Sequence, residues 1–284
     1  IWLGARLSAK SARVWSQLPL ALGAVRKISA QDPASEARLR SLPFPTDAIA
    51  PMCNLKALPR PAPPVRDTGV DWSRAQTVLA ASTHEGEEDI VLDAFRLARQ
   101  TNPSLRLILA PRHPRRALDV GDLISARGLK FVSRTSAVPL GDEDLVYLAD
   151  TLGEMTQWYR AAAITFVGGS LVEKGGHTPY EPATERSAIA HGPNTTNFSE
   201  PYLALSKAGA ALKVQDARTL ADAFLTASAT SAELGDRAHR ILVSDGPDRA
   251  AFNALITDIL ALFGDATADR AGTAHRLTAR QAAR

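Results

Sequence analysis

The spacing of apolar and polar positions becomes regular after Asp71. Short runs of consecutive apolar residues, the first at 77–82, alternate there with segments whose apolar side chains recur every three to four positions. Runs of this kind are typical of strands buried on both faces, and the longer spacing is typical of amphipathic helices. Strands are predicted at 77–82, 105–110, 129–133, 145–150, 164–168, 187–193 and 210–214. Helices are predicted at 87–100, 152–162, 181–187, 199–208, 217–228, 231–242 and 248–263, and another that ends near Gly128.

Strands and helices that alternate in this way require crossover connections. In parallel sheets these crossovers are right-handed and place helices on both faces. An α/β fold is therefore predicted, with a Rossmann-like, doubly wound parallel sheet. Such sheets bind ligands outside the carboxyl ends of their strands. The loops at 83–88, 111–116, 150–154 and 168–181 are expected to share that rim.

The first part of the chain carries a weaker pattern. A helix with Ser8 as its N-cap is predicted at 8–18, and a short strand at 28–30. A second helix is predicted at 33–42, with Asp32 as its N-cap and a proline in its first turn.

Proline content marks the expected domain boundary. Seven prolines between 43 and 64 interrupt regular structure and predict a linker. We interpret residues 1–64 as the last βα units of a domain that begins upstream, followed by this linker. Residues 65–263 are interpreted as a second domain, and the resemblance described below implies that its final helix crosses back to the first. Residues 264–284 are predicted to be a disordered tail.

Composition excludes several classes of protein. The 284 residues are 45% hydrophobic, enough for one large core or two moderate ones. No apolar run approaches the roughly 18 residues that a membrane-spanning helix needs, and no signal peptide opens the chain. The single cysteine, Cys53, excludes an intramolecular disulfide and is expected to be a packing residue in a reducing compartment.

Charge is distributed unevenly. Residues 1–66 carry 10 Lys/Arg against 3 Asp/Glu, whereas residues 67–263 carry 19 against 25. A basic first segment suits phosphates or an anionic membrane surface, and a solvated face explains it equally well. Aromatic residues do not interleave with these charges, so a nucleic-acid partner is not expected.

The central stretch at 166–186 combines a buried strand, two glycine pairs and a carboxylate, Glu181. Glycines allow a ligand to approach the backbone, and a helix start near Pro179 is expected to direct free N–H groups at an anion. Glu181 has the acceptor pair that two ribose hydroxyls require. The alternative is that the glycines only make turns and that Glu181 is an ordinary acid of a first helical turn.

Two more rim residues suit a nucleotide. Arg112 follows a predicted strand and has the donor geometry for a phosphate, with a surface salt bridge as the alternative. Glu154 stands at a predicted helix start, where the alternative is a capping role. No metal site is expected from the spacing of the rim histidines, and no GxSxG nucleophile motif is present. These histidines are His84, His113, His177 and His191.

Taken together, the rim motifs resemble one family. The strings STHEGEE, PRHPRR, DTLGEM, FVGGSLVEKGGHTPYEPA and HGPNTTNF occur in this order between 82 and 198. They resemble the transferases of 3-deoxy-D-manno-octulosonic acid (Kdo), which are glycosyltransferases of the GT-B type. NLK at 54–56 and ARLSAKSARVW at 5–15 are also similar to that family, so the resemblance covers nearly all of residues 3–263.

The resemblance implies a binding site for cytidine monophosphate (CMP). In the family, a Pro-Arg pair, a Leu/Met-Gly-Glu segment and an Asn-Pro-x-Glu segment hold CMP. The matching residues of this chain are Pro111, Arg112, Leu152, Gly153, Glu154, Thr178, Pro179, Tyr180 and Glu181. The chain departs from the family at Thr178, where asparagine is usual, and at Arg115, where an acid is more common.

The function implied is transfer of Kdo from CMP-Kdo to the lipid A precursor of lipopolysaccharide. The transfer would be inverting, would use no metal or other cofactor, and would take place at the cytoplasmic face of the bacterial inner membrane. The general base, a glutamate, and a membrane-associating segment are expected upstream of Ile1, in the N-terminal domain. Two alternatives remain open: an inert nucleotide-binding module, and a GT-B enzyme that uses a UDP-sugar.

Overall fold

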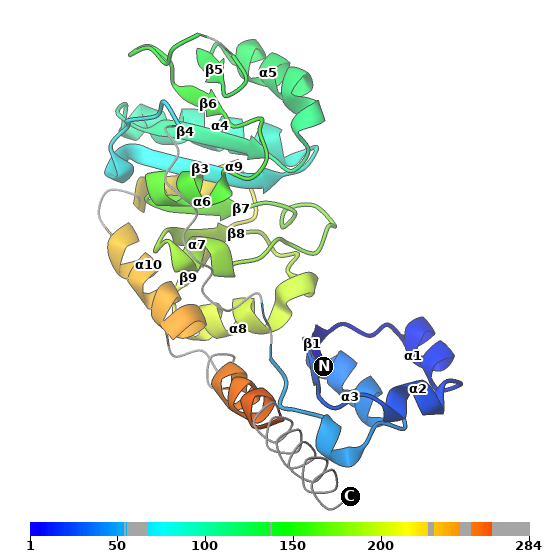
Figure 1. Cartoon of the computed structure of the whole chain (residues 1–284). Coiled ribbons are helices and arrows are strands. Elements are labelled where there is room, and N and C mark those ends of the chain that lie inside the picture. The colour runs from blue at the N-terminus through cyan, green and yellow to red at the C-terminus, as the bar shows by residue number, and fades with distance from the viewer. Residues whose placement is uncertain (54, 56–67, 137, 227–229, 245–250, 263–284) are drawn as a thin grey trace, which may run out of the picture. The chain divides into compact units, whose positions relative to one another are not determined.

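The structure, a computed structural model, describes residues 1–53, 55, 68–136, 138–226, 230–244 and 251–262 (Figure 1). Contacts divide the chain into two compact units, one of residues 1–58 and 246–284 and the other of residues 59–245. The predicted tail at 264–284 and the part of the predicted linker at 54 and 56–64 lie outside the described residues.

The first unit is built on two parallel strands, β1 (Trp2–Ala5) and β2 (Ile28–Ala30). Its helices are α1 (Ala9–Trp15), α2 (Pro19–Gly23) and α3 (Pro33–Arg40), followed by a 3₁₀ turn at Thr46–Ala48. Both predicted caps are confirmed: Ser8 accepts from the Ser11 N–H at 3.1 Å, and Asp32 accepts from the Ser35 N–H at 2.7 Å. The sequence pattern missed β1 and α2, which are four and five residues long.

Part of the predicted linker belongs to the core of this unit. The N–H of Ala50 donates to the Ile28 carbonyl, and that of Cys53 donates to the Ala30 carbonyl, both at 2.9 Å. Cys53 is fully buried beside Leu255 of the helix at 251–262. The prolines of the predicted linker therefore do not prevent the main chain at 50–53 from forming hydrogen bonds along β2.

The second unit contains a sheet of seven parallel strands, as predicted. Its strand order is β5-β6-β4-β3-β7-β8-β9. The strands are β3 (Thr77–Thr83), β4 (Arg106–Pro111), β5 (Phe131–Ser133), β6 (Val146–Leu148), β7 (Ile164–Val167), β8 (Ala188–His191) and β9 (Ala211–Lys213). The chain places β4, β5 and β6 on one side of β3 and then β7, β8 and β9 on the other, so the topological switch point lies between β3 and β7.

Helices connect most of these strands, and two helices follow the last strand. They are α4 (Glu87–Thr101), α5 (Ala117–Ala126), α6 (Met155–Ala161), α7 (Tyr180–Thr184), α8 (Ser199–Lys207), α9 (Ala217–Leu225) and α10 (Ser231–His239). Short 3₁₀ turns lie at Arg74–Gln76, Pro114–Arg116 and Thr196–Phe198, and a π-helical turn at Arg240–Ser244 follows α10. Asp216 caps α9, as predicted.

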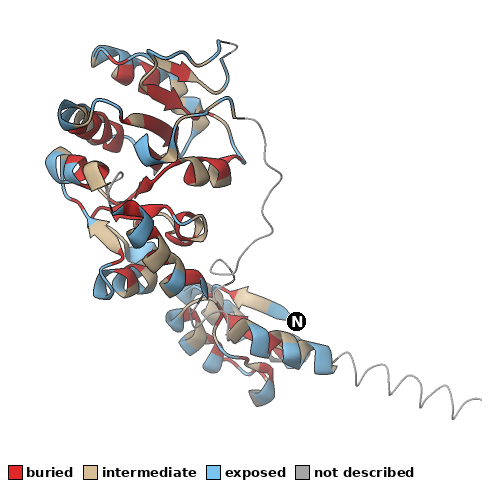
Figure 2. Ribbon diagram, turned by 90° about the vertical axis from the view of Figure 1, so that its left-hand side faces the viewer, coloured by how far each residue is buried: buried red, intermediate tan, exposed pale blue. Residues whose placement is uncertain are grey.

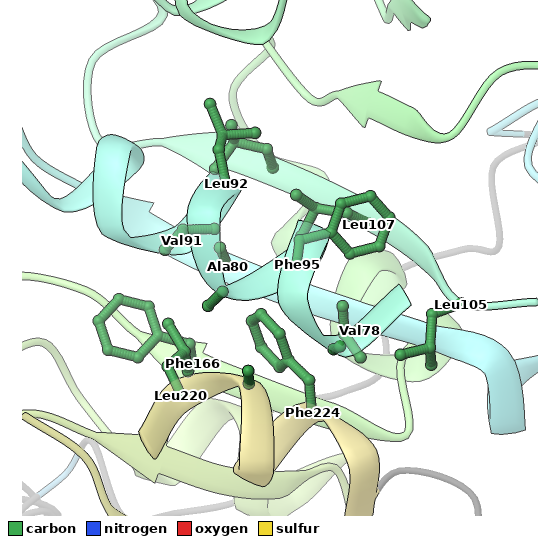
Figure 3. Packing of buried hydrophobic residues seen from close by; sticks show 14 of the residues in the cluster. Val78, Ala80, Val91, Leu92, Phe95, Leu105, Leu107, Phe166, Leu220 and Phe224 are labelled. Carbon is green, nitrogen blue, oxygen red and sulfur yellow. The ribbon is translucent and has the colours of Figure 1, made fainter. Parts of the chain in front are cut away.

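Alternating strand positions supply the two faces of the sheet. Val78 and Ala80 of β3 pack with α4 and α9 in one cluster (Figure 3). Leu79 and Ala81 point to the opposite cluster, which includes Trp158 of α6. Figure 2 shows the central strands buried along their length, while the helices carry exposed outer faces. This layered core holds the carboxyl ends of the strands at one rim.

Candidate nucleotide site at the carboxyl ends of the strands

The loop after β7 is tied to the start of α4 by a buried acid. Glu87, the first residue of α4, is completely buried. Its Oε1 accepts from the N–H groups of Ser170 (3.0 Å) and Leu171 (2.9 Å). Its Oε2 accepts from the N–H groups of Gly169 (2.7 Å) and His84 (2.9 Å). One carboxylate therefore joins the loops that leave β3 and β7, across the switch point.

This arrangement corrects the prediction of an open anion cradle in the glycine-rich stretch. The N–H groups of 169–171 bond the carboxylate of Glu87. Those of Gly168, Gly176 and His177 donate to the carbonyls of Ala81, Gly169 and Gly168. The N–H groups of the loop itself are therefore occupied, by an internal carboxylate at 169–171 and by main-chain carbonyls at 168, 176 and 177. The free N–H groups expected at the helix start near Pro179 stay a prediction.

The glycines permit close approach of main chain instead. A Cβ on Gly168 would lie 2.5 Å from the Ser82 carbonyl oxygen at the end of β3. The predicted helix start near Pro179 is confirmed, but α7 is only five residues long. A helix of little more than one turn aligns few peptide dipoles, so it contributes little positive potential.

The loop after β4 presents one arginine to solvent and uses another internally. Arg112 is exposed, and among the described residues its guanidinium has no hydrogen-bond or ion-pair partner. Its main-chain N–H donates to the Thr83 carbonyl at 2.9 Å, which fixes the start of the loop against β3. Arg116 instead pairs with the fully buried Glu88 at 2.6 Å. The alternative of a surface salt bridge at Arg112 thus finds no partner among the described residues, and the ion pair of this loop joins Arg116 to a buried acid.

Three of the four rim histidines gather beside Arg112. The Nε2 atoms of His84 and His177 are 2.9 Å apart, and the His113 ring centroid lies 6.0 Å from that of His84. Burial is the main cause that lowers the pKa of His177, to about 4, and neighbouring positive groups that include Arg112 add to it. Burial also lowers the pKa of His84. Nothing in the sequence pattern indicated this contact.

The fourth rim histidine, His191, lies apart from this group at the end of β8. It is buried, its Nδ1 bonds the Gly192 carbonyl, and its ring packs on Tyr202.

The segment after β6 divides into an exposed part and a buried part. Leu152 is 73% exposed, and Gly153 beside it is exposed with a φ of 84°. Glu154 is buried and forms an ion pair with Arg134, through Nη2 at 2.9 Å and Nε at 3.1 Å. The Thr151 hydroxyl donates to the same carboxylate. Glu154 precedes α6 without a capping hydrogen bond, so the alternative of a side-chain cap is wrong.

The last predicted segment is partly buried. Pro179 and Tyr180 are buried, whereas Thr178 and Glu181 are half-buried. The Thr178 hydroxyl accepts weakly from the Tyr180 N–H at 3.4 Å. The Tyr159 hydroxyl, on α6, donates to the Glu181 carboxylate at 3.5 Å. Burial, followed by the charge of Glu181, raises the pKa of Tyr159.

The nine residues that sequence predicts for the site thus come from the carboxyl ends of three strands. Pro111 and Arg112 follow β4, Leu152 to Glu154 follow β6, and Thr178 to Glu181 follow β7. The strand between β4 and β7 is β3, which contributes His84. Sequence reasoning missed the positioning partners Glu87, Glu88, Arg134 and Tyr159. Of these four, only Glu87 and Glu88 were recognisable in the sequence, as two adjacent acids at a predicted helix start.

A separate pocket of about 450 Å³ opens beside the Arg134 side chain, and none of the nine predicted residues lines it. Within the described part of the chain, no group of three or more His, Cys, Asp or Glu side chains is arranged to hold a metal ion. No helix in the described ranges has the length and hydropathy needed to cross a membrane.

Curated proteins of one name match the chain. Over 264 residues it is 32% identical to the 3-deoxy-D-manno-octulosonic acid transferase of Haemophilus influenzae, covering 85% of this chain and 60% of that protein. A stretch of 162 residues is 36% identical to the transferase of the same name from Bordetella pertussis, covering 54% of this chain and 38% of that protein. The chain therefore spans at most about 60% of the length of these relatives. No family model matches it.

Solved structures agree with the fold. The C-terminal CMP-Kdo binding domain of WaaA from Acinetobacter baumannii is 33% identical and superposes with a TM-score of 0.55. The match covers 59% of this chain and 89% of that domain. The structure of TarM has a TM-score of 0.50 at 10% identity, over 88% of this chain and 46% of that chain, which bears on the fold alone. The predicted α/β, Rossmann-like fold of the GT-B type is confirmed.

Proposed function

Because the chain belongs to the 3-deoxy-D-manno-octulosonic acid transferase family, we propose that the rim of its seven-stranded sheet binds CMP-Kdo as the donor of Kdo. The observation that carries this proposal is the similarity to the CMP-Kdo binding domain of WaaA, which extends over 89% of that domain at 33% identity. The site residues predicted from the sequence all lie within the second unit.

Arg112 is proposed to hold the phosphate of the donor. Its exposed guanidinium has no other partner among the described residues, and a planar fork of donors matches phosphate oxygens. The preceding residue, Pro111, is buried at the end of β4 and fixes the direction in which the loop leaves the sheet. Lys174, exposed in the loop after β7, adds positive charge near the histidines.

Glu181 is proposed to accept from the ribose hydroxyls. The Tyr159 hydroxyl orients one oxygen of its carboxylate, and no other described group bonds this side chain. Leu152 and Gly153 are exposed after β6, the strand next to β4, and are proposed to contact the base. The buried Glu154 is proposed to shape that segment through Arg134. Thr178, Pro179 and Tyr180 are proposed to position Glu181 and to line the nucleotide.

The transfer itself is proposed from the family. A hydroxyl of the lipid A precursor attacks the anomeric carbon of Kdo with inversion, the bond from that carbon to the phosphate oxygen breaks, and CMP departs. No metal is proposed to take part. Arg112 stabilises the charge that develops on the departing phosphate, as a fixed electrostatic group can. The general base stays a prediction, as does the location at the cytoplasmic face of the bacterial inner membrane.

Calorimetric titration of the purified chain tests the donor site. CMP is expected to bind, and UDP at the same concentration is expected to bind at least tenfold more weakly. The alternative of a UDP-sugar enzyme predicts the opposite order. Undetectable CMP binding at millimolar concentration, in protein shown by circular dichroism to be folded, would refute the proposal. Kdo transfer to a lipid A precursor, assayed with the same sample, separates an active protein from an inert binding module.

A further inference from the structure

His84 and His177 form a direct ring-to-ring hydrogen bond. Their Nε2 atoms are 2.9 Å apart and their ring planes differ by 5°. The ring centroids are 5.2 Å apart. This is the separation expected when the two Nε2 atoms lie on the line that joins the centroids, because each nitrogen is one ring radius from its own centroid. The rings are therefore coplanar and meet edge to edge instead of stacking face to face.

This geometry limits how many protons the pair can hold. At 2.9 Å one Nε2 donates and the other accepts, so only one hydrogen lies between the rings. Two neutral rings satisfy that condition, and so do one neutral and one protonated ring. If both rings were protonated, two N–H groups would point at each other and two positive charges would be adjacent. The pair can therefore take up one proton without losing its hydrogen bond.

The main chain holds both rings in place through one anchor. The anchor is the Glu87 carboxylate. The His84 main-chain N–H donates to it directly. The His177 N–H donates to the Gly168 carbonyl, and the N–H of the next residue, Gly169, donates to Glu87. The Tyr202 hydroxyl donates to the His177 carbonyl at 3.0 Å. The pair is thus fixed before any ligand arrives.

The charges that face the pair are mostly positive. Arg112 and His113 face both rings from the loop after β4, and Lys174 faces His84 from the loop after β7. Of the described acids, Glu88 faces His84 and is paired with Arg116, and Glu87 accepts from the His84 main-chain N–H. Burial, first, and the nearby charges of Arg112 and Lys174 lower the pKa of the rings and so favour the neutral pair in the free protein.

We propose that the His84–His177 pair takes up one proton when a phosphate group binds beside Arg112, which makes phosphate recognition proton-coupled. A bound phosphate places negative charge among the cations that otherwise disfavour protonation of the rings. The proposal rests on the proposed function, in which that phosphate belongs to the cytidine nucleotide. Its chemistry requires no metal or redox partner: a proton moves from solvent to an imidazole nitrogen.

The sign of the pH dependence follows from linkage. A group whose pKa rises on binding is protonated more in the complex than in the free protein. Binding then becomes tighter as pH falls, by at most about tenfold per pH unit for one proton. A pair that serves only to hold two loops together would give no such slope.

The test uses a ligand whose own phosphate does not titrate near neutral pH, the methyl phosphodiester of cytidine 5′-monophosphate. Calorimetry at pH 6.5 in two buffers of different ionisation enthalpy measures the protons taken up. The wild-type chain is expected to take up roughly 0.3 to 1 proton, and its affinity for the diester is expected to rise about two- to tenfold per pH unit between pH 8 and pH 6.5.

The variants His177→Gln and His84→Gln keep an amide group near the position of Nε2 but cannot be protonated. Each is expected to lower the proton uptake and to flatten the pH slope, because one ring of the pair can then no longer be protonated. His239→Gln is the matched control, because His239 lies on α10 and bonds the Ala183 carbonyl. It is expected to behave as the wild type does.

The outcomes distinguish failure of the proton-coupled pair from failure of the proposed nucleotide site. Diester binding without proton uptake in the wild type would overturn the proton-coupled pair and leave the nucleotide site intact. Equal uptake in the wild type and in both pair variants would also overturn it. Absence of diester binding to the folded wild type would overturn the proposed function and this inference with it. Because the two variants remove opposite partners, either one that folds is sufficient.

Discussion

Replacement of Glu87 by glutamine should separate the two loops that this carboxylate joins. Glu87 accepts four main-chain hydrogen bonds of 2.7–3.0 Å, from His84 and from residues 169–171. Glutamine has the same shape, but it offers one acceptor oxygen and an NH₂ group. The oxygen can still accept from Ser170 and Leu171. The NH₂ group then faces the N–H groups of Gly169 and His84, donor against donor.

The magnitude follows from those lost bonds. A hydrogen bond to a charged group contributes about 1.5–3 kcal/mol, so losing two removes about 3–6 kcal/mol. Glutamine avoids the desolvation of a fully buried charge, which offsets part of that loss. The net expectation is a fall of about 2–4 kcal/mol in the free energy of unfolding. Urea denaturation followed by circular dichroism measures it.

Glu88→Gln is the matched control for this substitution. Glu88 is also fully buried, but its partner is the Arg116 side chain and not the loop after β7. Both variants should lose stability, and only Glu87→Gln should accelerate amide hydrogen exchange at 169–171 and weaken CMP binding at pH 8. The same exchange rates at 169–171 in both variants, or a loss of stability below about 0.5 kcal/mol in Glu87→Gln, would refute the reasoning.

Two further substitutions test the nucleotide contacts by CMP titration. Glu181→Ala should weaken CMP binding by about 1.5–3 kcal/mol, the scale of a charged hydrogen bond, and an unchanged affinity would return Glu181 to an ordinary first-turn acid. Arg112→Gln should weaken CMP binding at least tenfold and leave binding of cytidine unchanged, because cytidine lacks the phosphate. Arg115→Gln, a change at another exposed arginine of the same loop, should alter neither affinity; an equal effect of both arginine variants would indicate a general charge effect.

The sheet could be predicted from the sequence because burial on both faces leaves a direct local trace. Each of the seven strands of the second unit overlaps a predicted run of apolar residues. Ends of elements were less accurate where local conformation overrides the pattern. The helix predicted at 152–162 begins only at Met155, after Gly153 with its φ of 84°. The short β1 was missed because four residues carry too little periodicity.

The candidate site could be placed only in part, because its supporting contacts join residues far apart in sequence. From its neighbours in sequence, Glu87 is an ordinary acid in the first turn of a helix. Nothing near it indicates that three of its four main-chain partners lie more than 80 positions later. The ion pair between Glu154 and Arg134 is equally invisible in the pattern. Motifs could identify which loops matter, whereas the three-dimensional contacts decide which groups in them remain open to a ligand.

The occupied main-chain donors of the glycine-rich loop change how an anion can be recognised at this rim. In the expected arrangement, free N–H groups would bind phosphate with a strength independent of pH, since amides do not titrate. Here Glu87 accepts from three N–H groups of the glycine-rich loop, so in the proposed site recognition falls to the side chains of Arg112, Lys174 and the paired histidines. Arginine and lysine keep their charge across the physiological range, but imidazole does not. In the proposed site, phosphate recognition would thereby become sensitive to protons.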